Sequence, residues 1–222
     1  MKYLLHIDTS TDTGAVALSA EGNLVAGIVN EESRNHAGTL NNMINNLLDE
    51  EGISFEDISA IAVCGGPGSY TGLRIGLSTA KGICYASNKP LILNNRLTLL
   101  AHQGWVKNKG MYSRYTVILN ARIKEYFVAM YDDNFECILE PQHKTEDQLL
   151  ALKLKDENVF IISNVPEETI NKLGVNNLKI DANITIDLKS WSIVAYEDYK
   201  CNNIVNLTLA EPFYLKQVYT HN

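Results

Sequence analysis

The chain has 222 residues, 45% of them hydrophobic and 20% charged, so it can form one domain or two small ones around a real hydrophobic core. Its formal net charge is −7 and it contains no run of basic residues, which excludes nucleic-acid binding by phosphate neutralisation alone. His6 and Asp8 interrupt the first apolar stretch, so we expect neither a signal peptide nor a membrane span. Four widely separated cysteines, with no Cys-x-x-Cys pair, are typical of a reduced, cytoplasmic protein.

The first half of the chain predicts elements in the order β-β-β-α-β-α-β-α. Short apolar runs between polar turns predict the strands Tyr3–Asp8, Ala15–Ala20 and Leu24–Asn30. Helical spacing follows at Leu40, Met43, Ile44, Leu47 and Leu48, up to a stop at Gly52. The remaining predicted elements of this half are the strand Ile58–Cys64, a helix over Thr71–Ala86, the strand Leu91–Leu93 and the helix Leu97–Lys107.

The second half of the chain repeats this order of elements in a degenerate form. It predicts three strands, Tyr115–Leu119, Tyr126–Tyr131 and Phe135–Leu139, and then the helix Thr145–Leu154, the strand Val159–Ser163 and the helices Pro166–Leu173 and Ser190–Tyr199. Three antiparallel strands followed by alternating helices and strands, twice over, predict an α/β protein with the actin-like (ribonuclease-H-like) fold. We expect two related lobes, residues 1–110 and a degenerate lobe of residues 111–222, each a mixed sheet flanked by helices.

A glycine-rich turn, Gly65–Gly76, separates a predicted strand from a predicted helix. This arrangement can present backbone N–H groups and the positive end of a helix dipole to an anion. However, no Gly-Lys-Ser/Thr follows, as a P-loop requires, and Thr71 stands where a dinucleotide fingerprint needs its third glycine. The turn therefore matches neither phosphate-binding motif.

The helix behind this turn carries small residues at Gly72, Gly76 and Ala80, one per helical turn. Glycine inside a helix costs about 1 kcal/mol relative to alanine, a cost that is tolerated where another backbone comes close. Two interpretations stay open: the helix packs tightly on its own sheet, or this face pairs with another subunit.

A nucleotide would be expected where strand ends and turns converge, and Asp8, Thr9 and Ser10 are weak candidates for a phosphate-binding turn. The alternative is that these side chains satisfy their own turn. Thirteen of the 14 glycines lie at or before Gly110, so the second lobe lacks the glycines that let a backbone approach ATP closely. The histidines form no pair at metal-ligand spacing. We therefore expect no catalytic residue, no metal and no cofactor; weak nucleotide binding at a subunit interface stays open.

Four motifs resemble those of the TsaB (YeaZ) family. These are Ile7-Asp8-Thr9-Ser10, the long run from Gly66 to Gly76, Asn120-Ala121-Arg122 leading into Glu125-Tyr126, and Ala210-Glu211-Pro212-Phe213-Tyr214-Leu215. The family usually has Asp-Ala-Arg where this chain has Asn120-Ala121-Arg122. The resemblance is concentrated in residues 1–131.

The resemblance implies a cytoplasmic, non-catalytic scaffold or activating subunit for threonylcarbamoyl transfer to the adenosine next to the anticodon of tRNAs that read ANN codons. It implies dimerisation with the catalytic paralogue TsaD, a further ATPase partner TsaE, contact with tRNA only through the complex, and no contact with a membrane. The family pairs through its first two helices, which can also form a homodimer. The partner-interface residues expected here are Leu40, Met43, Ile44, Leu47, Gly72, Arg74, Ile75, Gly76, Thr79, Ala80 and Ile83.

Two alternative functions are a small actin-like phosphotransferase and a protease-like protein acting on its own. Neither has a supporting motif. Arg74 is the only basic residue between Cys64 and Ala80. We expect it to bond a carboxylate or phosphate of a partner, or alternatively to form a salt bridge with Asp8 or Asp12.

Overall fold

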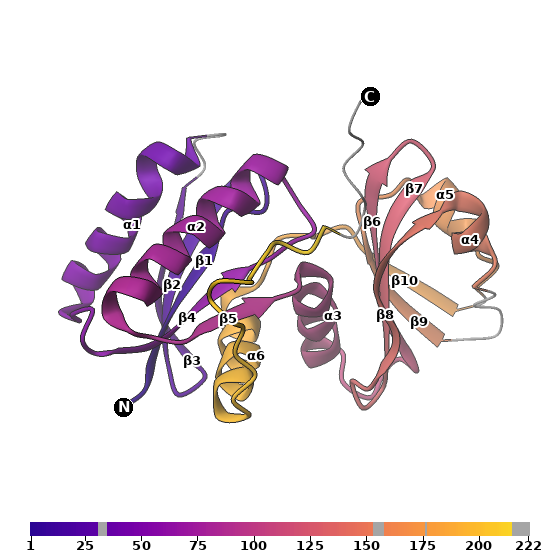
Figure 1. The fold of residues 1–222 in the computed structure, drawn as a ribbon. Helices are drawn as coiled ribbons and strands as arrows, with labels where there is room; N and C mark the ends of the chain where they lie inside the picture. The colour runs from indigo at the N-terminus through magenta and orange to yellow at the C-terminus, as the bar shows by residue number, and fades with distance from the viewer. Residues whose placement is uncertain (31–34, 153–157, 176, 215–222) are drawn as a thin grey trace, which may run out of the picture. The chain divides into compact units, whose positions relative to one another are not determined.

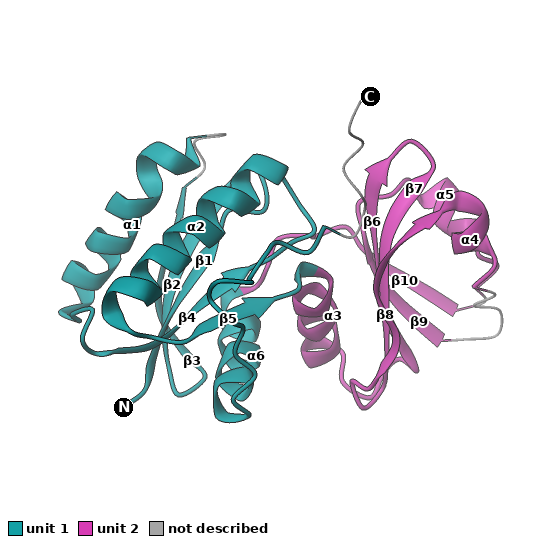
Figure 2. Ribbon diagram, in the orientation of Figure 1, with its two compact units in different colours: residues 1–96, 188–214 teal, residues 97–187, 215–222 magenta. Residues whose placement is uncertain are grey.

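The computed structural model describes residues 1–30, 35–152, 158–175 and 177–214. They form two compact units (Figure 2): residues 1–96 and 188–214 make up unit 1, and the described part of residues 97–187 belongs to unit 2. The chain therefore leaves unit 1 and returns to it, whereas the predicted lobes met at residue 110.

Unit 1 is built on a five-stranded sheet in the order β3-β2-β1-β4-β5 (Figure 1). The strands β1 (Tyr3–Asp8), β2 (Gly14–Ala20) and β3 (Asn23–Asn30) are antiparallel neighbours, and β4 (Ile58–Cys64) and β5 (Leu91–Asn94) continue the sheet in parallel with β1. Helices α1 (His36–Glu51) and α2 (Tyr70–Ser87) pack on the face that carries Leu5 and Ile7. Helix α6 (Leu188–Lys200) covers the opposite face, where His6 contacts Trp191. Because successive side chains of β1 point to opposite faces of the sheet, one set contacts α1 and α2 and the other contacts α6.

Unit 2 has the same strand order, with its sheet arranged as β10-β9-β6-β7-β8. The strands are β6 (Arg114–Arg122), β7 (Glu125–Asp132), β8 (Cys137–Thr145), β9 (Asn158–Ser163) and β10 (Asn177–Asp181). The short helices α4 (Glu146–Leu150) and α5 (Glu167–Asn171) pack on one face through Leu149 and Ile170. Helix α3 (Arg96–Lys107) packs on the other face, with Gly104 against Phe160 and Ile162.

Each sheet therefore places its first strand in the middle, its second and third strands antiparallel on one side, and its fourth and fifth parallel on the other. This order, present twice, is the actin-like (ribonuclease-H-like) fold, and the prediction of fold class is confirmed. Three details of the prediction are wrong. Strand β8 begins two residues later than predicted and extends to Thr145, the helix after it ends at Leu150, and β10 was not predicted. The alternating Leu178 and Ile180 are the signal that could have identified β10.

Candidate functional site

The turn after β1 and the glycine-rich turn after β4 are bonded to each other. The hydroxyl of Thr9 donates to the carbonyl of Gly72 (2.7 Å), and the amide of Ser69 donates to the carbonyl of Ser10 (2.8 Å). Within the first turn, the amide of Ser10 donates to Asp8 Oδ1 (2.8 Å). All three candidate phosphate-binding residues are buried, and these bonds serve the fold.

The glycines of the motif allow this close contact. A Cβ atom at Gly68 would lie 2.2 Å from the carbonyl oxygen of Ser10, and one at Gly72 would lie 2.0 Å from that of Thr9. Both distances are far below van der Waals contact, so only glycine fits at either position. The hydroxyl of Ser69 also accepts a hydrogen bond from the amide of Gly72 and caps the start of α2. The start of α2 thus lies directly against the turn that carries the weak phosphate-binding candidates.

The glycine turn is bonded to two further segments of unit 1. The amide of Gly65 donates to the carbonyl of Asn94, the amide of Phe213 donates to the carbonyl of Gly65, and the amide of Arg96 donates to the carbonyl of Gly66. The motif is therefore a junction at which β4, β5, α2 and the segment after α6 meet.

The thiol of Cys64 lies close to this junction. Cys64 is buried at the end of β4, and burial together with the nearby charge of Asp8 raises the pKa of its thiol well above the usual range. A thiol in this environment stays protonated. Among the described residues, no group of three or more His, Cys, Asp or Glu side chains is placed to hold a metal ion.

The structure corrects the expected partner face of α2. Gly72, Gly76 and Ala80 are buried against the sheet, and a Cβ atom at Gly76 would lie 2.3 Å from the hydroxyl of Thr9. These small residues let α2 approach its own sheet, so the interpretation as an inter-subunit face is wrong for them.

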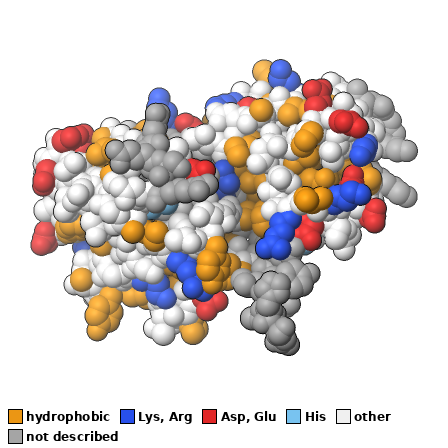
Figure 3. Space-filling view, turned by 90° about the horizontal axis from the view of Figure 1, so that it is seen from above, with side chains coloured by type: hydrophobic (Ala, Val, Ile, Leu, Met, Phe, Trp, Pro, Cys, Tyr) orange, Lys and Arg blue, Asp and Glu red, His pale blue; other side chains and the backbone are white. Residues whose placement is uncertain are grey.

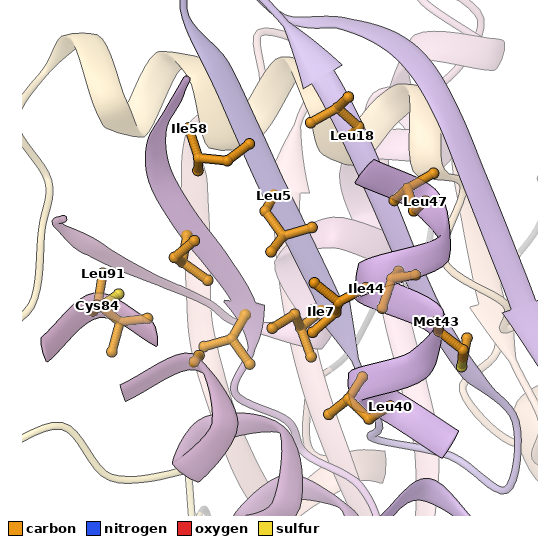
Figure 4. Close-up of a cluster of buried hydrophobic side chains, with 14 of the residues drawn as sticks. Leu5, Ile7, Leu18, Leu40, Met43, Ile44, Leu47, Ile58, Cys84 and Leu91 are labelled. Atoms are coloured by element: carbon orange, nitrogen blue, oxygen red, sulfur yellow. The ribbon is translucent and has the colours of Figure 1, made fainter. Parts of the chain in front are cut away.

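The same correction applies to the expected interface on α1. Leu40, Met43, Ile44 and Leu47 are between 1% and 7% exposed and point into the core formed with β1 and β2 (Figure 4). Their helical spacing reports the inner face of an amphipathic helix, which buries them within unit 1.

The part of α2 that faces outward is a neighbouring stripe. Of the expected interface residues, Arg74 is exposed, and Ile75, Thr79 and Ile83 are partly exposed. Ser78, Gly82 and Ala86, which were not among the residues expected from the sequence, are exposed. A Cβ atom at Gly82 would meet nothing within 4 Å. We call Ile75, Ser78, Thr79, Gly82, Ile83 and Ala86 the outer face of α2. The spacing of Ile75, Thr79 and Gly82 was the signal that could have indicated it.

Arg74 forms no salt bridge with Asp8 or Asp12, the alternative to a partner contact that the sequence left open. Its Nε donates to the hydroxyl of Tyr214 (3.1 Å), and its guanidinium carbon lies 4.2 Å from the ring centroid of Tyr70. These aromatic contacts take the place of a salt bridge to Asp8 or Asp12. None of the described helices is both long and apolar enough to cross a membrane.

Comparisons with known proteins agree with this geometry. A family model described as "TsaD: tRNA N6-adenosine threonylcarbamoyltransferase" matches residues 23–185. The tRNA threonylcarbamoyladenosine biosynthesis protein TsaB of Escherichia coli is 33% identical over 157 residues, which cover 66% of this chain and 67% of that protein. A tRNA N6-adenosine threonylcarbamoyltransferase of Clostridium perfringens is 36% identical over 112 residues, 43% of this chain but only 33% of the transferase.

The solved structure of YeaZ from Pseudomonas aeruginosa shares the fold, with a TM-score of 0.80 at 23% identity over 96% of this chain and all of that chain. The doubled strand order and the family match together define an actin-like protein related to the threonylcarbamoyltransferases. Within that class, the chain belongs to the TsaB (YeaZ) family.

Proposed function

We propose that this protein is the non-catalytic, activating subunit of a tRNA threonylcarbamoyladenosine synthesis complex, and that it pairs with the TsaD-type catalytic paralogue. The observation that carries the proposal is the contact of Gly68 and Gly72 with the carbonyls of Ser10 and Thr9. This contact places the start of α2 against the turn after β1, where an actin-like enzyme would be expected to hold a phosphate. In this proposal the chain binds no cofactor tightly, and nucleotide binding is at most weak and at the subunit interface.

The corresponding turn of unit 2 supports the same conclusion. The hairpin between β6 and β7 has Arg122, Ile123 and Lys124 at its tip, with no glycine, and Ile123 is 93% exposed. Bulky side chains at this tip do not suit the close backbone approach that a nucleotide phosphate needs. An activating role also fits the relatives, since the chain aligns with only a third of a full transferase.

We place the pairing surface on the outer face of α2. Gly82 and Ala86 offer a close approach to a partner helix, while Ile75 and Ile83 are partly exposed and also touch the core of unit 1. The same surface would form the homodimer when the partner is absent. We expect TsaE and tRNA to join only through the complex. In agreement with this, Figure 3 shows Lys and Arg side chains scattered among apolar and acidic ones on the face it draws.

The test is reconstitution of tRNA modification from purified components with and without this chain, combined with co-purification of the catalytic paralogue. Gly82→Arg places a long side chain in open space and replaces glycine with a good helix former, so it should not destabilise the chain, yet it should abolish pairing and lower modification to the level without the chain. Glu197→Arg, on α6 at the opposite face of the sheet, is the matched control and should pair normally. Modification that proceeds equally well without the chain would overturn the proposal.

A further inference from the structure

A hollow of about 390 Å³ lies where the segment after α6 crosses α2 in unit 1. It adjoins the outer face of α2, because Ser78 belongs to both. From α2 it is lined by Arg74, Ser78 and Lys81, and from the crossing segment by Glu211 and Tyr214. This hollow contains two cationic side chains that the proposed function does not yet use.

The guanidinium of Arg74 is held in place by aromatic side chains. Tyr214 accepts the hydrogen bond from its Nε, and the ring of Tyr70 lies against its face, with the two tyrosine rings 5.5 Å apart. The two terminal NH₂ groups make no hydrogen bond with the described residues. A guanidinium fixed in this way is preorganised to receive a planar, bidentate anion.

Lys81 lies two helical turns further along, on the same side of α2, about 10 Å away by the helix rise. Its amino group donates to the carbonyls of Thr208 (3.3 Å) and Ala210 (3.2 Å), which fix its position without neutralising its charge. Glu211 is the acidic residue of the lining. The hollow thus has a formal charge of +1, although the whole chain carries −7. No Asp or Glu occurs between Asp57 and Glu125, so α2 itself has no acidic residue.

We propose that this hollow is the receptor for an Asp or Glu side chain of the catalytic partner. The inference rests on the proposed function, because it names a contact within that pairing. A carboxylate carries one negative charge, which matches the +1 of the hollow, whereas a phosphate dianion would exceed it beside Glu211. The planar carboxylate also matches the fork of Arg74. Ser78 joins the hollow to the outer face of α2, so a helix seated on that face can place an acidic side chain here.

Calorimetry with the purified TsaD-type paralogue tests the contact. Arg74→Gln should weaken pairing about tenfold or more, the range expected for a lost charge-assisted hydrogen bond. Ser78→Glu leaves the contacts of Arg74 with Tyr70 and Tyr214 intact but places a negative charge in the hollow. It should weaken pairing to a similar extent. Lys200→Gln is the matched control, since Lys200 also lies over a tyrosine ring, that of Tyr196, and pairs with Glu197 on α6. It should bind like the parent chain.

Carbodiimide cross-linking of the complex identifies the carboxylate. The reagent couples the amino group of Lys81 to a carboxylate in contact with it, and mass spectrometry should find that amide on an Asp or Glu of the partner. If the Arg74→Gln and Ser78→Glu variants pair with the paralogue as tightly as the parent chain does, the hollow is not the carboxylate receptor, and the proposed function stands. A cross-link from Lys81 only to Glu211 would likewise overturn it. If the parent chain does not pair at all, the proposed function itself fails.

Discussion

Replacing Gly72 with alanine directly tests the close contact between the start of α2 and the turn after β1, which we call the closed turn. The new Cβ atom would lie 2.0 Å from the carbonyl oxygen of Thr9, whereas non-bonded contacts need about 3.5 Å, so the two backbones must separate by more than about 1 Å. Hydrogen bonds from Thr9 to Gly72 and from Ser69 to Ser10 resist that movement. Overpacking of this kind costs about 3 kcal/mol at the upper end of its usual range, and the gain in helix propensity returns about 1 kcal/mol. We expect a net loss of about 2 kcal/mol.

Gly82→Ala is the matched control in the same helix. Its Cβ atom meets nothing within 4 Å, so only the propensity gain of about 0.5–1 kcal/mol remains and the variant should be more stable than the parent. Urea unfolding followed by tryptophan fluorescence in a Trp105→Phe background reports unit 1, because Trp191 is then the only tryptophan. The Gly72→Ala midpoint should fall by about 1 M. A Gly72→Ala chain as stable as the Gly82→Ala chain would refute the close contact.

Three further predictions follow from the buried groups of unit 1 and from its closed turn. Thr9→Val removes the hydroxyl that donates to Gly72 and should cost about 1 kcal/mol in the same urea assay; an unchanged midpoint would show that this bond contributes nothing. Burial lowers the pKa of His6 from 6.5 to about 3, so His6 is neutral in the folded chain and takes up a proton on unfolding below pH 6.5. Stability should therefore fall as the pH drops from 6.5 to 3, by on the order of 4–5 kcal/mol from this group, and His6→Asn should flatten that slope; an equal slope would contradict it. The isolated chain should hydrolyse no ATP above background, and tight ATP binding by calorimetry would contradict the closed turn.

The amino-acid pattern predicted the elements of the described chain and their order, with the exception of β10. Short apolar runs bounded by polar turns placed β1 and β4 at their observed bounds, and helical spacing placed α1 and α2, because these signals depend only on neighbours along the chain. The doubled order of elements then predicted the fold class. The glycine motif was also singled out from the sequence, since so many glycines at a helix start indicate a close backbone contact.

What lies against that motif was decided only by tertiary contacts. Helix α2 has small residues on two sides, Gly72 and Gly76 on one and Gly82 on another, and helical spacing does not distinguish the side that meets the sheet. The choice depends on the β1 turn, whose Thr9 is 63 residues away from its partner Gly72. Arg74 contacts Tyr214, which is 140 residues away, and α6 returns to unit 1 after the stretch 97–187, which belongs to unit 2. Local periodicity carries no information on such distant pairs, because they form only when the chain closes on itself and excludes water from both surfaces.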